Sequence, residues 1–272
     1  MFVFLVVVFG AVLLLCTPAL LGLADADYLV ILTPLAQWLP ALAVIVALRA
    51  TRSPEKLGAA WTARPVTRQT LRTSLLITGA VLAVPVLQLG IGILIGIVDW
   101  RPAPDALTTA IWIAPFAVLA LLSAAGEEFG WRGFLWSRVR ASRGFWVAAV
   151  IVGVIWSAWH LPLLLAYGLQ GDLEWRVVLA SSVNLVVASL VLGLGRELSG
   201  SAWPAAWGHA LLNSALVFAA ANLVTPDAAL DDAPFWAYTA LGWAAWVGIA
   251  VGIAAVARRR RAPVTVSRPA IR

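Results

Sequence analysis

Apolar residues in this chain fall in long blocks and do not alternate or follow one helical stripe. A helix needs roughly 20 apolar residues to cross about 30 Å of hydrocarbon, and the blocks have about this length. The pattern therefore predicts an all-α, polytopic integral membrane protein with about eight transmembrane helices. The predicted spans cover residues 2–23, 28–48, 74–98, 106–125, 145–165, 177–195, 202–224 and 235–257.

Composition argues against a soluble protein. Of the 272 residues, 62% are hydrophobic and 12% are charged, whereas about 25% of residues in soluble domains are charged. The net charge of +6 does not indicate a nucleic-acid partner, because the basic residues track the loops and do not cluster on a soluble surface. We expect membrane lipids around the chain and no nucleic acid.

The distribution of charge predicts the orientation in the membrane. Of the 19 basic residues, all except Arg101 and Arg176 lie in or beside alternate loops, and the positive-inside rule assigns these loops to the cytoplasm. We therefore expect a multi-pass protein of the cell membrane with both termini cytoplasmic. Acidic residues collect on the other side, at Asp25, Asp27, Asp99, Asp105, Asp172, Glu174, Asp227, Asp231 and Asp232.

The chain divides into three regions without a separate soluble domain. Residues 1–105 contain the N-terminal helices and a basic cytoplasmic loop at 49–73, residues 106–220 contain the polar motifs, and residues 221–272 contain the last helix and a basic tail. We interpret the first block as a span, although cleavage after it as a signal peptide remains an alternative. Cys16 is the only cysteine, so no disulfide within the chain is expected.

Ionisable side chains interrupt three of the hydrophobic regions. Such groups are costly inside a bilayer, so they normally face a partner and indicate a functional site. The first interruption is Glu127 and Glu128, followed by Arg132. On a helix, Glu128 and Arg132 lie one turn apart and can pair, whereas Glu127 points about 100° away. One carboxylate is thus expected to be paired, and the other to be free for chemistry.

The other two interruptions contain the two histidines of the chain. His160 lies within the block at 145–165, four residues after Trp156. His209 lies within the block at 202–224, and the four-residue spacing puts it on the same helix face as Asn213. A lone histidine in a span usually serves packing. Together with the double glutamate, the two histidines favour a functional cluster.

Depth in the membrane is consistent with one shared site. Glu127 and His160 lie at similar distances on either side of a basic turn near residue 142, so antiparallel helices bring them to one level. The stretch at 107–139 is too long for an upright span, and we expect it to tilt or to break at Gly126, Gly130 or Gly133.

These motifs resemble those of the type II CAAX prenyl endopeptidase family, also called the CPBP or Abi family of intramembrane proteases. The family pattern is Glu-Glu-x-x-x-Arg, then an aromatic residue four positions before a histidine, then His-x-x-x-Asn or His-x-x-x-Asp. Trp156 stands where phenylalanine is commoner in the family, and since both are apolar rings we expect little consequence. The matching residues, within about 106–220, are Glu127, Glu128, Arg132, Trp156, His160, His209 and Asn213.

The resemblance implies an endopeptidase that hydrolyses peptide bonds in a cavity within the bilayer. Two residues would activate one water and two would donate to the oxyanion, namely Glu127 with His160 and His209 with Asn213. Glu128, Arg132 and Trp156 would be supporting residues. The cavity is expected to open to the cytoplasm and to admit a peptide or membrane-protein substrate.

Metal dependence is left open by the motifs. Members of the family are often labelled metalloproteases, and Glu127, His160 and His209 could ligate zinc with one position open. The His-Glu-x-x-His spacing of zinc peptidases is absent, however, and Asn213 is a better oxyanion donor than zinc ligand. We favour a mechanism without a cofactor and keep Zn²⁺ as the alternative.

Two other functions compete with this interpretation. A serine protease using Ser157 or Ser201 would leave the double glutamate without a purpose, and Ser157 lies only three residues before His160 on one helix, a poor geometry for mutual activation. A non-catalytic membrane binding or immunity protein, or a carrier, could use the same polar cluster. Heavy use of Ala, Arg and Trp with a single lysine indicates a bacterial source, for which we predict no prenylated substrate.

Overall fold

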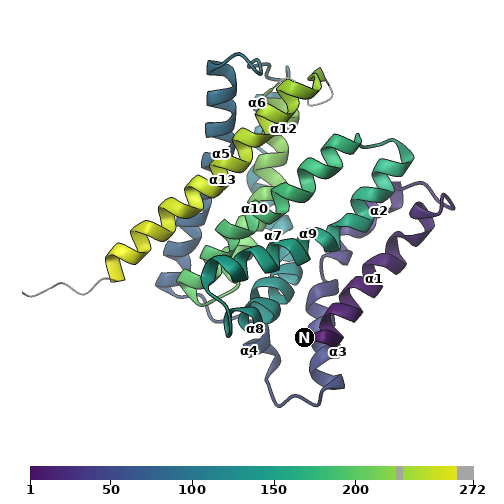
Figure 1. Cartoon of the computed structure of the whole chain (residues 1–272), viewed down its shortest axis with the longest axis vertical. Coiled ribbons are helices and arrows are strands. Elements are labelled where there is room, and N and C mark those ends of the chain that lie inside the picture. The colour runs from purple at the N-terminus through teal and green to yellow at the C-terminus, as the bar shows by residue number, and fades with distance from the viewer. Residues whose placement is uncertain (225–228, 262–272) are drawn as a thin grey trace, which may run out of the picture.

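The computed structural model describes residues 1–224 and 229–261, which form a bundle of helices (Figure 1). This described part contains α-helices, two π-helical segments and one isolated bridge between Trp100 and Val224, which confirms the all-α prediction. Residues 262–272 of the predicted basic tail and the loop residue Asp227 lie outside the described residues. In chain order the elements are α1 (Phe2–Leu20), α2 (Asp27–Ala36), α3 (Leu39–Ala50), α4 (Leu57–Ala60), α5 (Arg68–Leu94), α6 (Ala106–Ala110), α7 (Ile113–Glu128), the π-helix η1 (Phe129–Leu135), α8 (Trp136–Arg140), α9 (Phe145–Gln170), α10 (Trp175–Ser199), α11 (Trp203–Leu211), the π-helix η2 (Leu212–Leu216), α12 (Val217–Asn222) and α13 (Asp232–Arg261).

The helices are those of a multi-pass membrane protein. Within the described ranges, six are long and apolar enough to cross a membrane, and α2 with α3 adds a seventh if this pair, bent by 50°, is one broken span. Each of the predicted blocks coincides with helical structure. The block at 202–224 differs from the others because the π-helix η2 divides it between α11 and α12.

Prolines explain the bend between α2 and α3. Pro34 lies inside α2 and Pro40 lies in the first turn of α3, where a missing backbone N–H is tolerated. Gln37 and Trp38 form the turn between the two helices. The bend places this turn inside the bundle, where the Gln37 side chain is 7% exposed.

The long stretch at 107–139 was expected to tilt or to break at a glycine, and the structure shows no break at Gly126, Gly130 or Gly133. The break comes earlier, between α6 and α7, and Ile113–Arg140 is then one continuous helical run that passes from α into π geometry at Phe129. The glycines serve close packing. A Cβ on Gly126 would lie 2.7 Å from the backbone oxygen of Gln37, and one on Gly130 would lie 2.4 Å from Cβ of Pro40. Only residues without a side chain let α7 and η1 approach the α2–α3 bend this closely.

The run from α7 through η1 lies at the centre of the bundle, and every residue from 124 to 136 is buried. Helix α11 packs against α7, α5 and α10, while α9 packs against α10 and α1. Gly200 ends α10 in the left-handed conformation, with φ of +71°, and thereby turns the chain back into the bundle. This return places α11 and His209 beside α7.

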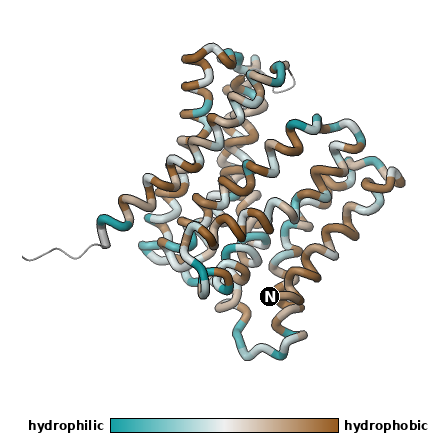
Figure 2. The backbone as a smooth tube through the Cα atoms, in the orientation of Figure 1, coloured by the Kyte–Doolittle hydropathy of each residue, from teal (hydrophilic) through white to brown (hydrophobic). Residues whose placement is uncertain are grey.

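Consecutive helices run in opposite directions, so the loops between them lie alternately at two ends of the bundle. The loops at one end are basic and those at the other end are acidic. Figure 1 shows the N-terminus, α4 and α8 on the lower side, and α6 and α12 at the top. Figure 2 shows the tube mostly hydrophobic along the helices and hydrophilic at the turns. We call the basic end the one with Arg49, Arg52, Lys56, Arg64, Arg68, Arg72, Arg138, Arg140, Arg143, Arg258 and Arg259, and the acidic end the one with Asp25, Asp27, Asp99, Asp105, Asp172, Glu174, Asp231 and Asp232.

Candidate active site

Glu127 is the central polar group of the bundle. It lies in the last turn of α7 and is fully buried. Gln37 Nε2 donates to its Oε1 at 3.0 Å, and Trp156 Nε1 donates to its Oε2 at 2.6 Å. Two donors fix the orientation of the carboxylate and compensate for its burial, while each oxygen keeps a lone pair for another partner. Glu127 is therefore held in place, and not unattached as its position beside a paired Glu128 had suggested.

His160 faces Glu127 from α9. Its Nδ1 lies 2.9 Å from the carbonyl oxygen of Trp156, one turn earlier on the same helix. Because a carbonyl oxygen only accepts, Nδ1 carries the proton, and in the neutral ring Nε2 keeps its lone pair. That Nε2 lies 4.0 Å from Glu127 Oε2. The two atoms are too far apart for a direct hydrogen bond but close enough to share a small partner.

Glu128 forms the predicted ion pair with Arg132. Nη1 of Arg132 donates to Glu128 Oε1 at 2.8 Å, and both side chains are fully buried. His209 Nδ1 lies 3.0 Å from the same oxygen. Since a carboxylate accepts, His209 carries a proton on Nδ1, so Nε2 is its remaining ring nitrogen. The ion pair thus also orients the imidazole of α11.

Trp156 connects these groups. Its ring centroid lies 5.4 Å from that of His160 and 5.1 Å from that of His209, in edge-on contacts. The guanidinium carbon of Arg132 lies 4.3 Å from the same ring, a cation–π distance. Little consequence was expected from tryptophan in place of phenylalanine, but the structure shows one difference: a phenyl ring has no N–H to donate to Glu127.

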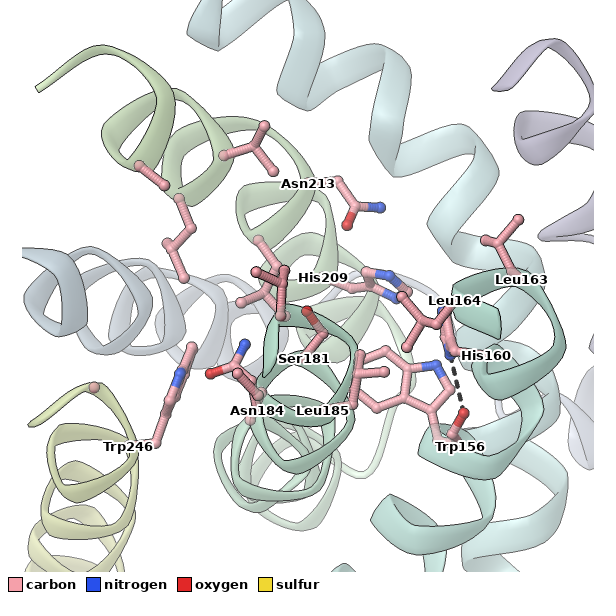
Figure 3. Close-up of a pocket in the computed structure, with 18 of the residues that line it drawn as sticks. Trp156, His160, Leu163, Leu164, Ser181, Asn184, Leu185, His209, Asn213 and Trp246 are labelled. Atoms are coloured by element: carbon pink, nitrogen blue, oxygen red, sulfur yellow. Dashed lines mark hydrogen bonds between the residues drawn. The ribbon is translucent and has the colours of Figure 1, made fainter. Parts of the chain in front are cut away.

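Asn213 lies apart from the hydrogen-bonded network. It belongs to η2, and its carboxamide makes no hydrogen bond within residues 1–224 and 229–261. The side chain is exposed, and Figure 3 shows it on the same side of its helix as His209, beside the same cavity. Glu128–Arg132 and His209–Asn213 each span the start of a π-helical segment, a local geometry that is frequent at functional sites.

Gln37 is the site residue that the motifs did not indicate. It lies in the first 105 residues of the chain, far in sequence from the other groups, and donates directly to Glu127. The signal available in the sequence is a carboxamide inside the apolar block at 28–48, between two prolines. A polar residue at membrane depth is the same kind of signal that marked the histidines.

A cavity of about 760 Å³ adjoins the site. Its wall includes Glu127, Trp156, His160, His209 and Asn213 (Figure 3). The remainder is mostly apolar, from α1, α2, α5, α9, α10, α12 and α13, with a few uncharged polar side chains such as Ser181 and Asn184 on α10. Its size is within the range of pockets that enclose small ligands or peptide side chains.

The three residues named as zinc ligands, Glu127, His160 and His209, are not grouped as a metal site among the described residues. Among the described residues, no three His, Cys, Asp or Glu side chains are grouped so that they could hold a metal ion. Tetrahedral zinc ligands at about 2.0–2.2 Å have donor atoms roughly 3.3–3.5 Å apart. The 4.0 Å between Glu127 Oε2 and His160 Nε2 exceeds that separation.

Comparison with known proteins places a family domain over this site. Residues 109–215 match the family model described as type II CAAX prenyl endopeptidase Rce1-like. A stretch of 50 residues is 38% identical to CAAX prenyl protease 2 of Methanococcus maripaludis, and this stretch covers 18% of each chain. The matched region 109–215 contains every site residue discussed except Gln37. The resemblance indicated by the motifs is thereby confirmed, because residues 109–215 are similar to the Rce1-like model of type II CAAX prenyl endopeptidases.

Proposed function

We propose that the protein is an intramembrane endopeptidase, a hydrolase that cleaves peptide bonds with a water activated by Glu127 and His160. The observation that carries the proposal is the pairing of a buried, oriented carboxylate with an imidazole whose cavity-side nitrogen has a free lone pair. In apolar surroundings a group of this kind is costly to maintain, which supports a functional role.

The 4.0 Å separation between Glu127 Oε2 and His160 Nε2 suits one shared water. A water at the usual hydrogen-bond distance of about 2.8 Å can reach both atoms. Glu127, assisted by His160, would take a proton from the water as its oxygen attacks the carbonyl carbon. The same proton would then pass to the leaving nitrogen as the C–N bond breaks, so that the two groups return to their starting states.

The negative charge that develops on the carbonyl oxygen needs donors. Asn213 offers a carboxamide N–H₂ group without another partner among the described residues, and His209 offers Nε2. Because His209 Nδ1 donates to Glu128, the ring can donate from Nε2 only as the imidazolium ion. The Glu128 carboxylate stabilises that ion, so the Glu128–Arg132 pair would act as a positioning support for the oxyanion donors.

This mechanism requires no metal, and it assigns a role to each polar group at the site. Gln37 and Trp156 would keep the Glu127 carboxylate directed toward the water. The substrate class that fits a cavity within a membrane bundle is a peptide segment embedded in the membrane. The charge distribution supports an orientation in the cell membrane with both chain termini in the cytoplasm.

The test is to compare membrane peptides in cells that express the wild type or Glu127→Gln. The amide keeps the shape of the side chain but cannot take a proton from water. We expect cleavage products to disappear while the amount of inserted protein stays near that of the wild type. His160→Ala should lose the same products. Ser182→Ala should retain them, because the Ser182 hydroxyl donates to the carbonyl of Val178 on its own helix and the carbonyl of Ser182 that accepts from Ser157 is kept.

Metal chelation separates the two mechanisms in the purified protein. A chelator should leave cleavage unchanged, whereas a zinc enzyme would lose activity and regain it when metal is added. If Glu127→Gln processes the same peptides as the wild type, the protease proposal fails and a non-catalytic binding or immunity role explains the polar cluster better.

A further inference from the structure

The cavity lies in one half of the bundle. Each helix contributes the half that leads to the acidic end: α1 from Val12 on, α5 from Val84 on, α9 from Trp156 on, and α10 and α13 by their first halves. After His209, the wall continues along η2 and α12 to Val224, in the bridge with Trp100. These segments share the acidic end because consecutive helices run in opposite directions.

Exposure along the wall agrees with this placement. The cavity-lining residues of α10, Ser181, Asn184 and Leu185, are partly exposed. The lining residues Asn213, Val217 and Ala220, on the way to the acidic end, are exposed. Helix α12 and the cavity wall on α10 therefore leave a route from the acidic end to the site. Figure 3 shows Ser181 and Asn184 of α10 beside the space that His209 and Asn213 also face.

The opposite direction, from the site to the basic end, is closed by packing. The buried run at 124–136 begins just before Glu127 and continues through η1. Trp131 and Trp136 are among its fully buried side chains, and the Arg132 guanidinium lies over Trp156 beneath the site. A path for water or peptide from the basic end would have to pass through this core, which is packed too tightly to admit either.

The charges predict which end faces the cytoplasm. Arginine and lysine collect at the basic end, whereas the two arginines at the acidic end each pair with a carboxylate there, Arg101 with Asp99 and Arg176 with Glu174. By the positive-inside rule the basic end is cytoplasmic. The cavity then lies in the extracytoplasmic half of the bilayer, opposite to the side expected from the sequence.

We propose, building on the function proposed above, that the substrate enters from the extracytoplasmic side as an apolar peptide segment of an exported or membrane-inserted protein. The mostly apolar wall with a few carboxamide and hydroxyl groups suits a hydrophobic strand whose backbone needs some hydrogen-bond partners. A substrate presented by a cytoplasmic chain end would meet the packed basic end instead.

Cysteine accessibility tests this proposal without requiring turnover. In a Cys16→Ala background, which removes the one native cysteine, single cysteines would be placed at Ser181 in the cavity, Asp172 at the acidic end and Ser142 at the basic end. Intact bacterial cells would be treated with a charged maleimide that does not cross the membrane, and then compared with opened membranes and with denatured protein.

We expect Asp172→Cys and Ser181→Cys to be labelled in intact cells and Ser142→Cys to be labelled only after the membranes are opened. Labelling of Ser142→Cys but not Asp172→Cys in intact cells would overturn the orientation. Suppose that Asp172→Cys is labelled in intact cells. If Ser181→Cys then reacts only in opened membranes or only after denaturation, the proposed route of access is wrong.

The same labelling in a Glu127→Gln background separates this proposal from the proposed chemistry. An unchanged labelling pattern together with loss of cleavage supports both. An unchanged pattern with retained cleavage supports the access route and refutes the catalytic role of Glu127.

Discussion

The two halves of the bundle differ in how they accommodate polar side chains. On the side of the basic end, the run at 124–136 is wholly buried, and it encloses the charged pair Glu128–Arg132 without solvent. On the side of the acidic end, Ser181, Asn184 and Leu185 of α10 are partly exposed and line a cavity that also has uncharged polar groups. The buried half fixes geometry, and the open half provides room for a ligand. Glu127 and Trp156 lie at the boundary between them.

The largest effect expected in the packed half comes from Arg132→Ala. It leaves the fully buried Glu128 without its cation, and breaking a buried pair in this way costs about 3–5 kcal/mol. Protein yield and thermal stability in detergent would measure the loss. Arg138→Ala is the matched control, because its partner Glu55 is partly exposed and such a pair contributes at most about 1 kcal/mol.

The double variant Glu128→Gln with Arg132→Gln removes both charges and should recover yield relative to Arg132→Ala. A double variant that is no more stable than the single one would show that the ion pair is not what the packed half depends on.

In the open half, Asn213→Ala should slow cleavage without unfolding the protein. Loss of one oxyanion donor typically lowers kcat by about 10²–10³-fold, and the exposed Asn213 makes no hydrogen bond among the described residues that folding would require. Rates with a purified substrate peptide would measure the effect. Asn184→Ala removes a carboxamide from another helix of the cavity and should alter KM more than kcat. Equal effects on kcat would contradict the role given to Asn213.

At the boundary, Trp156→Phe should lower the rate while keeping the fold. The phenyl ring retains the aromatic contacts, but the hydrogen bond to Glu127 is lost, and a bond to a charged group contributes about 1.5–3 kcal/mol. We expect kcat to fall with KM nearly unchanged. Trp159→Phe, which removes an indole N–H that bonds to the backbone of Val8, is the control and should have little effect on kcat. An unchanged rate in Trp156→Phe would show that Trp156 contributes to packing and not to the orientation of Glu127.

The smallest effect should come from glycine substitutions that separate packing from helix propensity. Gly126→Ala introduces a Cβ 2.7 Å from the backbone of Gln37, and overpacking of this kind costs about 1–3 kcal/mol. Gly79→Ala in α5 meets no atom within 4 Å and should stabilise the helix by up to about 1 kcal/mol. Melting temperatures would be measured for the two variants. Similar melting temperatures would show that the α2–α3 bend moves to accommodate the added methyl group.

The sequence predicted the parts of this structure that depend on local patterns. Long apolar blocks determine where helices cross the membrane, so their positions were predicted well. The four-residue spacing of Glu128 and Arg132 predicted their ion pair, because both residues lie on one helical run. Depth predicted that Glu127 and His160 lie at one level, and both line the same cavity.

Other features depend on packing between distant segments and could not be predicted in this way. Gln37 reaches Glu127 only because the α2–α3 bend and Gly126 allow two backbones to approach each other. The hydrogen bond from Trp156 requires a particular rotation of α9 against α7. The half of the bundle that holds the cavity could not be predicted either, because it depends on how side chains fill the space between the helices.

The two π-helical segments limit how this site could be transplanted. A π-helix has more residues per turn than an α-helix, so side chains at a given spacing along η1 and η2 project at different angles from those on a straight α-helix. A designer who copied the motif residues onto ideal α-helices would keep the spacing and lose the directions. Deleting one residue from either segment would remove its wide turn and change the directions of the side chains within it. The motifs therefore specify a working arrangement only together with the irregular backbone that carries them.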